Sequence, residues 1–192
     1  MQVSSEFESD ILDIIKSRRS RRAFLGEPIE VEKIKSLFEA ARWAPSSANE
    51  QPWAYVYGAR DQPELWNKIF DALNESNKTW AKDAPLLVVS LARRYHSKND
   101  RPNNSAKYDV GAANAFLSLQ ATQLGLNVHQ MGGFDHAVLR QNLNVPEIFD
   151  TGVVMAIGYA GNPAQLPVPL RERELSPRRR YLQNEFVMNH TF

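Results

Sequence analysis

Two arginine-rich segments carry the residue types that bind an anion. The first, residues 18–22, reads RRSRR, and the second, residues 178–180, lies near the C-terminus. Arginine suits phosphate because its guanidinium presents parallel N–H donors. In an extended segment alternate side chains point the same way, so Arg178 and Arg180 could share one anion while Arg179 faces solvent. The alternatives are a solvated charged turn for the first segment, and a solvated run or a nucleic-acid patch for the second.

Two turns could present small groups to a ligand. Residues 44–53 read APSSANEQPW, so short polar side chains lie between two prolines on a stiff connection from a helix to a strand. Such a turn could hold hydroxyls and amides against a heterocycle, although serines bonded to their own backbone at a helix end would look the same. Gly132 and Gly133 follow a short predicted strand, where paired glycines let backbone N–H groups approach a ligand or simply make a tight turn.

The apolar periodicity predicts the helices that position these segments. Ser5 and Glu8 have the spacing of a capping box before the apolar residues 11–15. A second helix follows Pro28 and ends by Ala44, because the residue before Pro45 disfavours the helical conformation. Further helices are predicted over residues 62–74, over 108–124 with Gly125 as the stop, and up to 143 from a cap at Asp135.

Apolar or aromatic runs of strand length occur at residues 53–57, 86–91 and 152–159, and a short strand is expected at residues 127–130. Residues 93–107 are polar and are expected to form the most mobile loop. Residues 162–169 hold three prolines and are expected to be an extended connector rather than a helix, and the basic tail beyond Ser176 reads as an arm lying on another surface. Few strands and irregularly interleaved helices favour an α+β fold, a layered sheet with helices around it. No glycine-rich phosphate loop follows the first strand, which excludes a Rossmann or P-loop fold.

Composition narrows the chemistry further. The chain has no cysteine, which excludes disulfides, thiolate metal sites and cysteine nucleophiles. The four histidines lack metal-ligand spacing, so we expect no metal site, and no catalytic triad or carboxylate pair stands out. The net charge of +1 argues against a dedicated polyanion binder. The 192 residues fit one domain. Without a signal-peptide pattern or an apolar run of membrane-spanning length, we expect a soluble cytoplasmic protein with no membrane partner.

Taken together and in this order, the segments resemble the FMN-dependent nitroreductase family. The resemblance runs from about Ile11 to Val187. The stretches that carry it are residues 18–24 (RRSRRAF), 44–53 (APSSANEQPW), 131–134 (MGGF), 157–159 (IGY) and 176–180 (SPRRR), with a weaker match at Asn77 and Trp80.

The resemblance implies one FMN-binding domain over residues 1–192, with a nitroreductase-like layered sheet flanked by helices. It implies an intertwined homodimer with a C-terminal arm and two FMN sites at the dimer interface. It also implies ping-pong chemistry, in which NADH or NADPH reduces FMN and leaves, and a small-molecule oxidant such as a nitroaromatic or a quinone takes its place.

The resemblance also implies a role for each motif residue. The phosphate and ribityl end of FMN would be held by Arg18, Ser20, Arg178 and Arg180. The positive charges reaching toward the ring, where negative charge develops, would be Arg19 and Arg22. The contributions of the partner subunit would be Pro45, Ser46, Ser47 and Asn49. The remaining ring contacts would be Asn77, Met131 and Gly133, together with the N–H of Gly132 pointing at flavin N5.

Other functions remain open. The chain could be another enzyme of the same superfamily, such as a reductive dehalogenase, a flavin-cleaving oxygenase or an azoline oxidase, which assays of flavin breakdown and nitroreduction would separate. A non-enzymatic nucleic-acid binder would show an affinity that falls steeply with salt. Many family members carry an acidic residue in place of Gly132, and some a lysine in place of Trp80. The physiological oxidant, the redox potential and the choice between NADH and NADPH are therefore left open.

Overall fold

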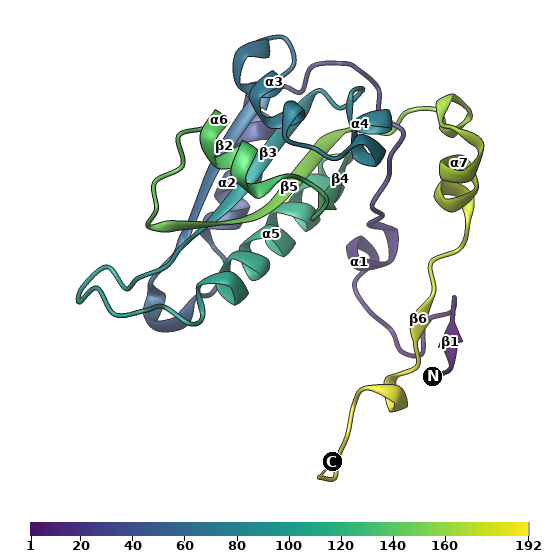
Figure 1. Ribbon diagram of the computed structural model, residues 1–192. Coiled ribbons are helices and arrows are strands. Elements are labelled where there is room, and N and C mark those ends of the chain that lie inside the picture. Colours follow the sequence, from purple (N-terminus) through teal and green to yellow (C-terminus); the bar gives the residue numbers. More distant parts are fainter. Residues whose placement is uncertain (192) are drawn as a thin grey trace.

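The computed structural model describes residues 1–191, in which a helix-covered sheet carries two terminal segments that extend away from it (Figure 1). The sheet has four antiparallel strands in the order β2-β3-β5-β4. The strands are β2 (Trp53–Ala59), β3 (Leu86–Arg93), β4 (Leu126–Met131) and β5 (Phe149–Tyr159). Each contains one of the predicted strands, and β5, which carries residues 157–159, is an inner strand as expected.

Helices cover both faces of the sheet, because side chains alternate between two cores along the inner strands. Leu87 and Val89 of β3 face the core that includes residues of three helices, while Leu86 and Val88 face the core that includes residues of two others. The first group comprises α3 (Pro63–Asp71), α4 (Glu75–Ala81) and α6 (His136–Asn142), and the second comprises α2 (Val31–Arg42) and α5 (Ala106–Gln123). This is the expected α+β arrangement.

Local signals located three helices well. The helix predicted after Pro28 is α2, and the one predicted over residues 108–124 is α5, followed by Gly125 at a φ of +75°. Asp135 caps α6 as predicted, because its carboxylate accepts hydrogen bonds from Ala137 N–H and Val138 N–H at 2.9 and 3.0 Å.

The start of the chain differs from its prediction. The capping box at Ser5 and Glu8 does not form, and the first helix, α1 (Asp13–Ser17), begins after Leu12 without a side-chain cap. The Glu8 carboxylate instead accepts the N–H of Gln183 at 2.7 Å. Residues near the N-terminus are therefore held by the C-terminal segment, a long-range contact that overrides the local capping signal.

Two other helices were missed. The stretch 62–74 is not one helix, because α3 ends at Asp71 and α4 begins anew after Asn74, whose side chain accepts the Asn77 N–H at 2.9 Å. The connector over residues 162–169 is extended only in part. A 3₁₀ turn (Pro163–Gln165) is followed by α7 (Val168–Leu175), which begins after Pro167. Prolines at the start of a helix are tolerated because no intrahelical N–H is needed there.

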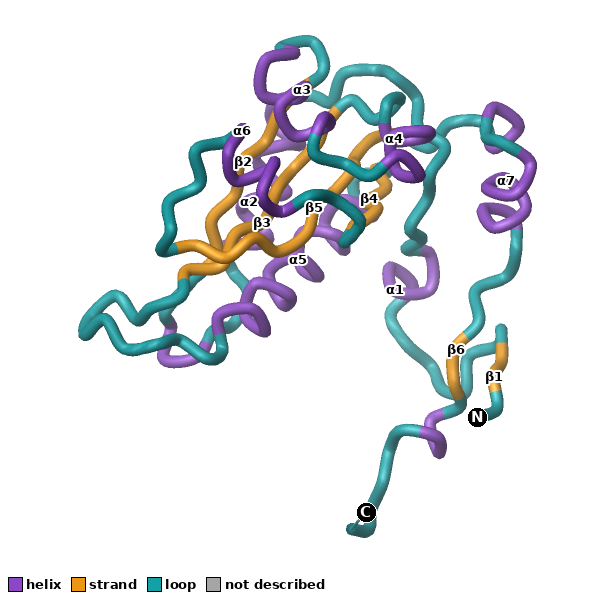
Figure 2. The backbone as a smooth tube through the Cα atoms, viewed as in Figure 1, coloured by secondary structure: helices purple, strands orange, loops and turns teal. Residues whose placement is uncertain are grey.

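The two ends of the chain lie side by side, apart from the main sheet (Figure 2). Strand β1 (Val3–Ser4) pairs antiparallel with β6 (Arg180–Tyr181), and a short 3₁₀ helix (Gln183–Glu185) follows. None of the helices within residues 1–191 is both long and apolar enough to cross a membrane.

Candidate functional site

The first arginine-rich segment is anchored through its backbone. The carbonyl oxygen of Arg21 lies 3.0 Å from Nδ1 of His129 on β4, which therefore donates the hydrogen bond. The carboxylate of Glu174 on α7 accepts the N–H of Arg22 at 2.9 Å and that of Ala23 at 3.4 Å. These bonds fix the path of the chain while leaving the guanidinium groups available.

The two arginine-rich segments meet, although they lie at opposite ends of the sequence. Arg178 donates hydrogen bonds to the carbonyl oxygens of Ile15 at 3.3 Å, of Arg18 at 2.6 Å and of Lys16. Its guanidinium group thereby caps the C-terminal end of α1. Arg18 also donates to the hydroxyl of Ser20 at 3.3 Å. The four side chains assigned by sequence to the phosphate and ribityl end of the cofactor are neighbours in a single chain, because Ser20 is bonded to Arg18 and because Arg18, Arg178 and Arg180 line one cleft.

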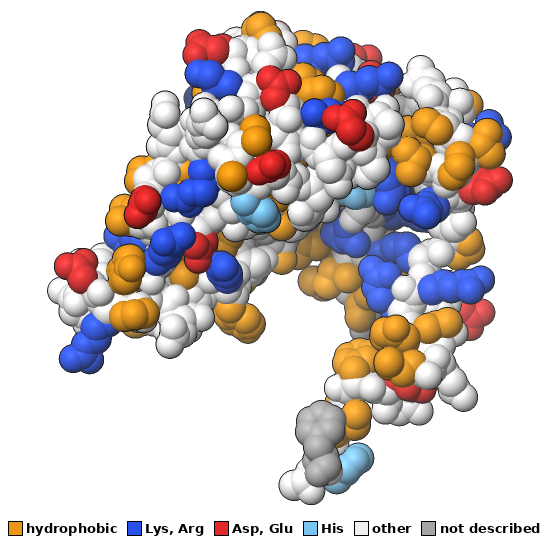
Figure 3. All heavy atoms as spheres, viewed as in Figure 1, with side chains coloured by type: hydrophobic (Ala, Val, Ile, Leu, Met, Phe, Trp, Pro, Cys, Tyr) orange, Lys and Arg blue, Asp and Glu red, His pale blue; other side chains and the backbone are white. Residues whose placement is uncertain are grey.

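The charge of this cluster is compensated in part by the buried carboxylate of Glu174, which lies near Arg22. None of the ion pairs within residues 1–191 involves an arginine of either segment. Burial lowers the pKa of Arg178, and repulsion from Arg18, Arg180 and Arg19 lowers it further. The pKa of Arg18 is lowered by burial and by Arg180. Figure 3 shows basic side chains gathered in the hollow between the body and the terminal segments. Such a cluster is stabilised by an anion.

The glycine turn is built to hold one backbone N–H outward. The carbonyl oxygen of Gly133 accepts the N–H of Asn74 at 3.1 Å and the side-chain amide of Asn77 at 2.9 Å. A Cβ on Gly133 would lie 2.3 Å from Nδ2 of Asn74, so a larger residue there would displace the Asn74 side chain that caps α4. Gly132 is exposed, has open space around it and adopts no positive φ, and its N–H donates no hydrogen bond within the described residues.

Trp80 connects this turn with the arginine segment. It lies on α4 with Asn77 and is 2% exposed. Its ring centroid is 4.5 Å from that of His129, and the Arg22 guanidinium carbon lies 6.0 Å from its ring centroid. Burial, reinforced by Arg22, lowers the pKa of His129 to about 4. The imidazole is therefore neutral at pH 7 and adds no charge to the cluster.

The turn at residues 45–49 lies elsewhere, at the N-terminal end of α5. The N–H of Ser47 donates to the carboxylate of Asp109 on α5 at 3.2 Å. Three residues of this region have a positive φ, namely Ala48 at 51°, Asn49 at 55° and Gln51 at 50°. No hydrogen bond within the described residues joins this turn to the arginine cluster or to the glycine turn. One chain alone does not bring all the predicted residues together.

Arg19 and Arg180 both donate hydrogen bonds to backbone carbonyl oxygens. Arg19 donates to the carbonyl oxygens of Glu174 at 3.3 Å and Ser176 at 2.6 Å, and Arg180 donates to that of Arg179 at 2.8 Å. Sequence reasoning missed the residues that support the cluster, above all Glu174 and His129. Glu174 lies in the charged run RERE and His129 in a short strand, and neither carries a local signal of its role.

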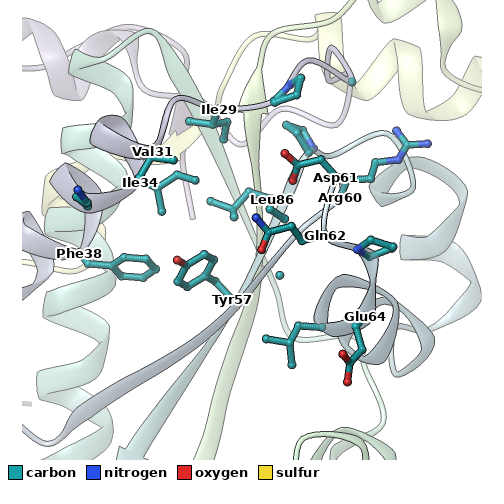
Figure 4. A pocket seen from close by; sticks show the side chains of 18 residues that line it. Ile29, Val31, Ile34, Phe38, Tyr57, Arg60, Asp61, Gln62, Glu64 and Leu86 are labelled. Carbon is teal, nitrogen blue, oxygen red and sulfur yellow. The ribbon is translucent and has the colours of Figure 1, made fainter.

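The largest cleft of the chain lies away from these residues. It has a volume of about 900 Å³ and lies between α2 and α3, beside the outer edge of β2 (Figure 4). Ile34, Phe38, Tyr57 and Leu65 contribute to its apolar lining, and Arg60 is among the polar residues that line it. None of the site residues predicted from the sequence lines it.

The fold is that of known oxidoreductases. A solved oxidoreductase containing FMN is 32% identical to this chain and superposes with a TM-score of 0.92, covering 97% of this chain and 95% of its own. A nitroreductase family protein from Clostridium difficile 630 is 22% identical and shares the fold with a TM-score of 0.74, covering 96% of this chain and all of its own.

The family model of the nitroreductases matches residues 15–159, and the chain belongs to this family. A relative from Archaeoglobus fulgidus, which carries the name NADH dehydrogenase/NAD(P)H nitroreductase, is 30% identical over 154 residues, which is 78% of this chain and 85% of that protein. The nitrobenzene nitroreductase of Ectopseudomonas oleovorans is 49% identical over a shorter stretch of 87 residues, 45% of this chain and 38% of that enzyme. The family resemblance noted in the motifs is thus confirmed.

Proposed function

We propose that this protein is an FMN-dependent NAD(P)H oxidoreductase that reduces nitroaromatics, quinones or similar small oxidants by a ping-pong mechanism. The observation that carries the proposal is the arginine cluster. Guanidinium groups from residues 18–22 and 178–180 converge without forming an ion pair within residues 1–191, beside a glycine turn with a free N–H, in a chain of the nitroreductase family. Within one domain, this combination fits a phosphorylated redox cofactor. The cytoplasmic location remains a prediction.

The residues present fit FMN in their chemistry. A phosphate dianion matches a cluster in which burial, and then mutual repulsion, lowers the pKa of Arg18 and Arg178. The hydroxyl of Ser20, already bonded to Arg18, adds a donor for the same group or for the ribityl chain. Nothing in the sequence resembles an adenine site, so the mononucleotide is the expected form of the flavin.

Bound FMN would supply the redox chemistry by accepting hydride equivalents from NAD(P)H and passing them to the oxidant. The chain would supply binding, orientation and charge. The Gly132 N–H would donate to N5 of the flavin ring, because it is exposed and unbonded at the end of β4. The Arg22 guanidinium would provide positive charge near the ring, held in place by its backbone anchors and by Trp80.

The proposal includes a homodimer in which each site is lined by both subunits. The residues Pro45, Ser46, Ser47 and Asn49 make no contact with the arginine cluster of their own chain, so they would serve the site of the partner. The outer face of α5 supports this, because Tyr108, Gly111, Ala115 and Phe116 form an exposed stripe at helical spacing. The cleft beside β2 and the extended terminal segments are further apolar surfaces that a second copy could cover.

The purified protein tests the proposal directly. It should be yellow, or should bind FMN with quenching of flavin fluorescence, and heat should release FMN and not FAD. It should oxidise NADH or NADPH with a nitroaromatic or a quinone as acceptor. A colourless protein that leaves FMN fluorescence unchanged would overturn the cofactor. Flavin breakdown in place of nitroreduction would indicate another enzyme of the superfamily.

The arginine cluster has its own test. Replacing Arg178 and Arg180 together with alanine should weaken FMN binding strongly and riboflavin binding little, because riboflavin has no phosphate. Charge-assisted hydrogen bonds to phosphate contribute on the order of 1.5–3 kcal/mol each. The single Arg180→Ala variant is the matched control for the role of Arg178 at the end of α1. An equal loss for both ligands would contradict the phosphate role.

A further inference from the structure

Glu174 is an acidic side chain buried next to the arginine cluster. It is 4% exposed and is the buried residue of α7, a helix whose other side chains include the exposed Val168 and Leu175. A buried carboxylate is costly unless hydrogen bonds satisfy it. Here both carboxylate oxygens accept hydrogen bonds from the backbone, one from the N–H of Arg22 at 2.9 Å and the other from the N–H of Ala23 at 3.4 Å.

The carboxylate bonds to the backbone of the arginine segment and not to its guanidinium groups. No ion pair within residues 1–191 involves Glu174. Burial lowers the pKa of Arg22 and the nearby Glu174 carboxylate opposes that shift, but the carboxylate forms no hydrogen bond to a guanidinium group of the cluster. The main chain of the same residue adds a second connection, because the Glu174 carbonyl oxygen accepts the guanidinium of Arg19 at 3.3 Å, next to the bond from Arg19 to Ser176 O at 2.6 Å.

These bonds join the two halves of the cluster. Glu174 lies four residues before Arg178, and its bonds tie the end of α7 to residues 19–23. We propose that Glu174 is a positioning residue for phosphate binding, which sets the spacing between residues 18–22 and 178–180 so that both converge on one anion. The inference rests on the proposed function and assigns to that site a residue that would not touch the ligand.

A positioning role and a purely electrostatic role of Glu174 predict opposite changes in phosphate affinity when the side chain is replaced. A negative charge beside an anion site opposes the anion, so removing the charge alone should tighten phosphate binding. Removing a positioning residue should weaken it. The variant Glu174→Gln removes the charge and places an amide donor where two N–H groups need acceptors. Glu174→Asp keeps the charge but shortens the side chain, so it separates position from charge.

Glu172 provides the matched control. It lies on the same helix and is exposed, and its side chain makes no hydrogen bond to residues 18–23. Glu172→Gln changes the net charge by the same amount without touching the segment. Dissociation constants for FMN and for riboflavin are measured by fluorescence quenching on the full chain, with circular dichroism and thermal melting to verify the fold.

We expect Glu174→Gln and Glu174→Asp each to weaken FMN binding by about tenfold or more and riboflavin binding by less than about threefold, as for lost charge-assisted hydrogen bonds. Glu172→Gln should bind FMN as tightly as the parent or more tightly. The positioning role is wrong if both Glu174 variants bind FMN like the parent, or if both lose the two flavins equally. If Glu174→Gln does not fold, Glu174→Asp decides. A parent protein that binds no FMN would instead overturn the proposed function.

Discussion

Gly132 and Gly133 are adjacent, yet an added Cβ would meet close neighbours only at Gly133. Space around Gly132 is open and its φ is not positive, so Gly132→Ala should keep both the fold and the N–H. Gly132→Pro removes the N–H. In a dry site, losing one such donor costs roughly 2.7–4 kcal/mol of transition-state stabilisation. Stopped-flow reduction by NAD(P)H, normalised to bound flavin, should therefore slow by about a hundredfold or more in the proline variant only. A folded, FMN-loaded proline variant reduced at the parental rate would show that the N–H is not used.

His129 should make stability depend on pH. Its pKa is lowered from 6.5 to about 4 by burial and by Arg22. The unfolded chain therefore takes up a proton below about 6.5 that the folded chain refuses until about 4, and the free energy of unfolding falls over that window. The loss amounts to about 2 kcal/mol between pH 7 and pH 5. The free energy of unfolding, measured with urea at both pH values, should fall less between pH 7 and pH 5 in His129→Gln than in the parent. In His190→Gln, a change at an exposed residue, it should fall as much as in the parent. Identical falls in all three proteins would contradict the assignment.

At the scale of elements, Glu50 connects the turn at residues 45–51 with the loop that follows β3. The Glu50 carboxylate, 5% exposed, accepts the N–H of Ser97 at 2.8 Å and its hydroxyl at 3.1 Å, and pairs with Arg93. These hydrogen bonds, with Arg93 and His96 nearby, lower the pKa of Glu50. The segment predicted to be the most mobile loop is thus tied at one point to the turn that the family resemblance assigns to the flavin.

Glu50→Gln should loosen both segments. The amide cannot accept as many hydrogen bonds as the carboxylate, so amide hydrogen exchange should accelerate in residues 94–105 and in residues 46–51. Exchange in β3 itself should not change. Glu147→Gln, at an exposed position before β5, is the control for the change in charge. Unchanged protection in both segments would mean that other contacts hold the loop.

Elements were predictable from the sequence where local interactions determine them. Helix α2, the long α5 and the Asp135 cap follow from periodicity and capping that lie within a few residues. The boundary between α3 and α4 has a local signal, the Asn74 cap, which the apolar periodicity of residues 62–74 did not reveal. The start of α1 depends on tertiary contacts, such as that between Glu8 and Gln183. The same holds for the site. Motif residues were visible as patterns of residue type, whereas Glu174 acts through bonds to backbone 151 and 152 residues away, which no local pattern encodes.

For the whole molecule, the exposed stripe of α5 predicts self-association. Phe116, which is 42% exposed in the single chain, should be buried between two copies. Phe116→Glu should therefore shift the protein toward monomers in sedimentation velocity and reduce FMN binding, because each proposed site needs the partner's turn. Val138→Glu, on an exposed position of α6, should leave the dimer intact. A parent protein that is a folded monomer at micromolar concentration would contradict the dimer.

The meeting of Arg178 with Arg18, 160 residues apart, has a consequence for biosynthesis. The last strand of the main sheet ends at Tyr159, and the core residues that follow it, Leu166 and Leu170, still precede Arg178, so a growing polypeptide could assemble both cores before the second arginine segment leaves the ribosome. The proposed phosphate site would not yet exist at that moment. Cofactor loading would then be a late step that follows chain release, and messages cut short after the sheet would yield folded but colourless protein.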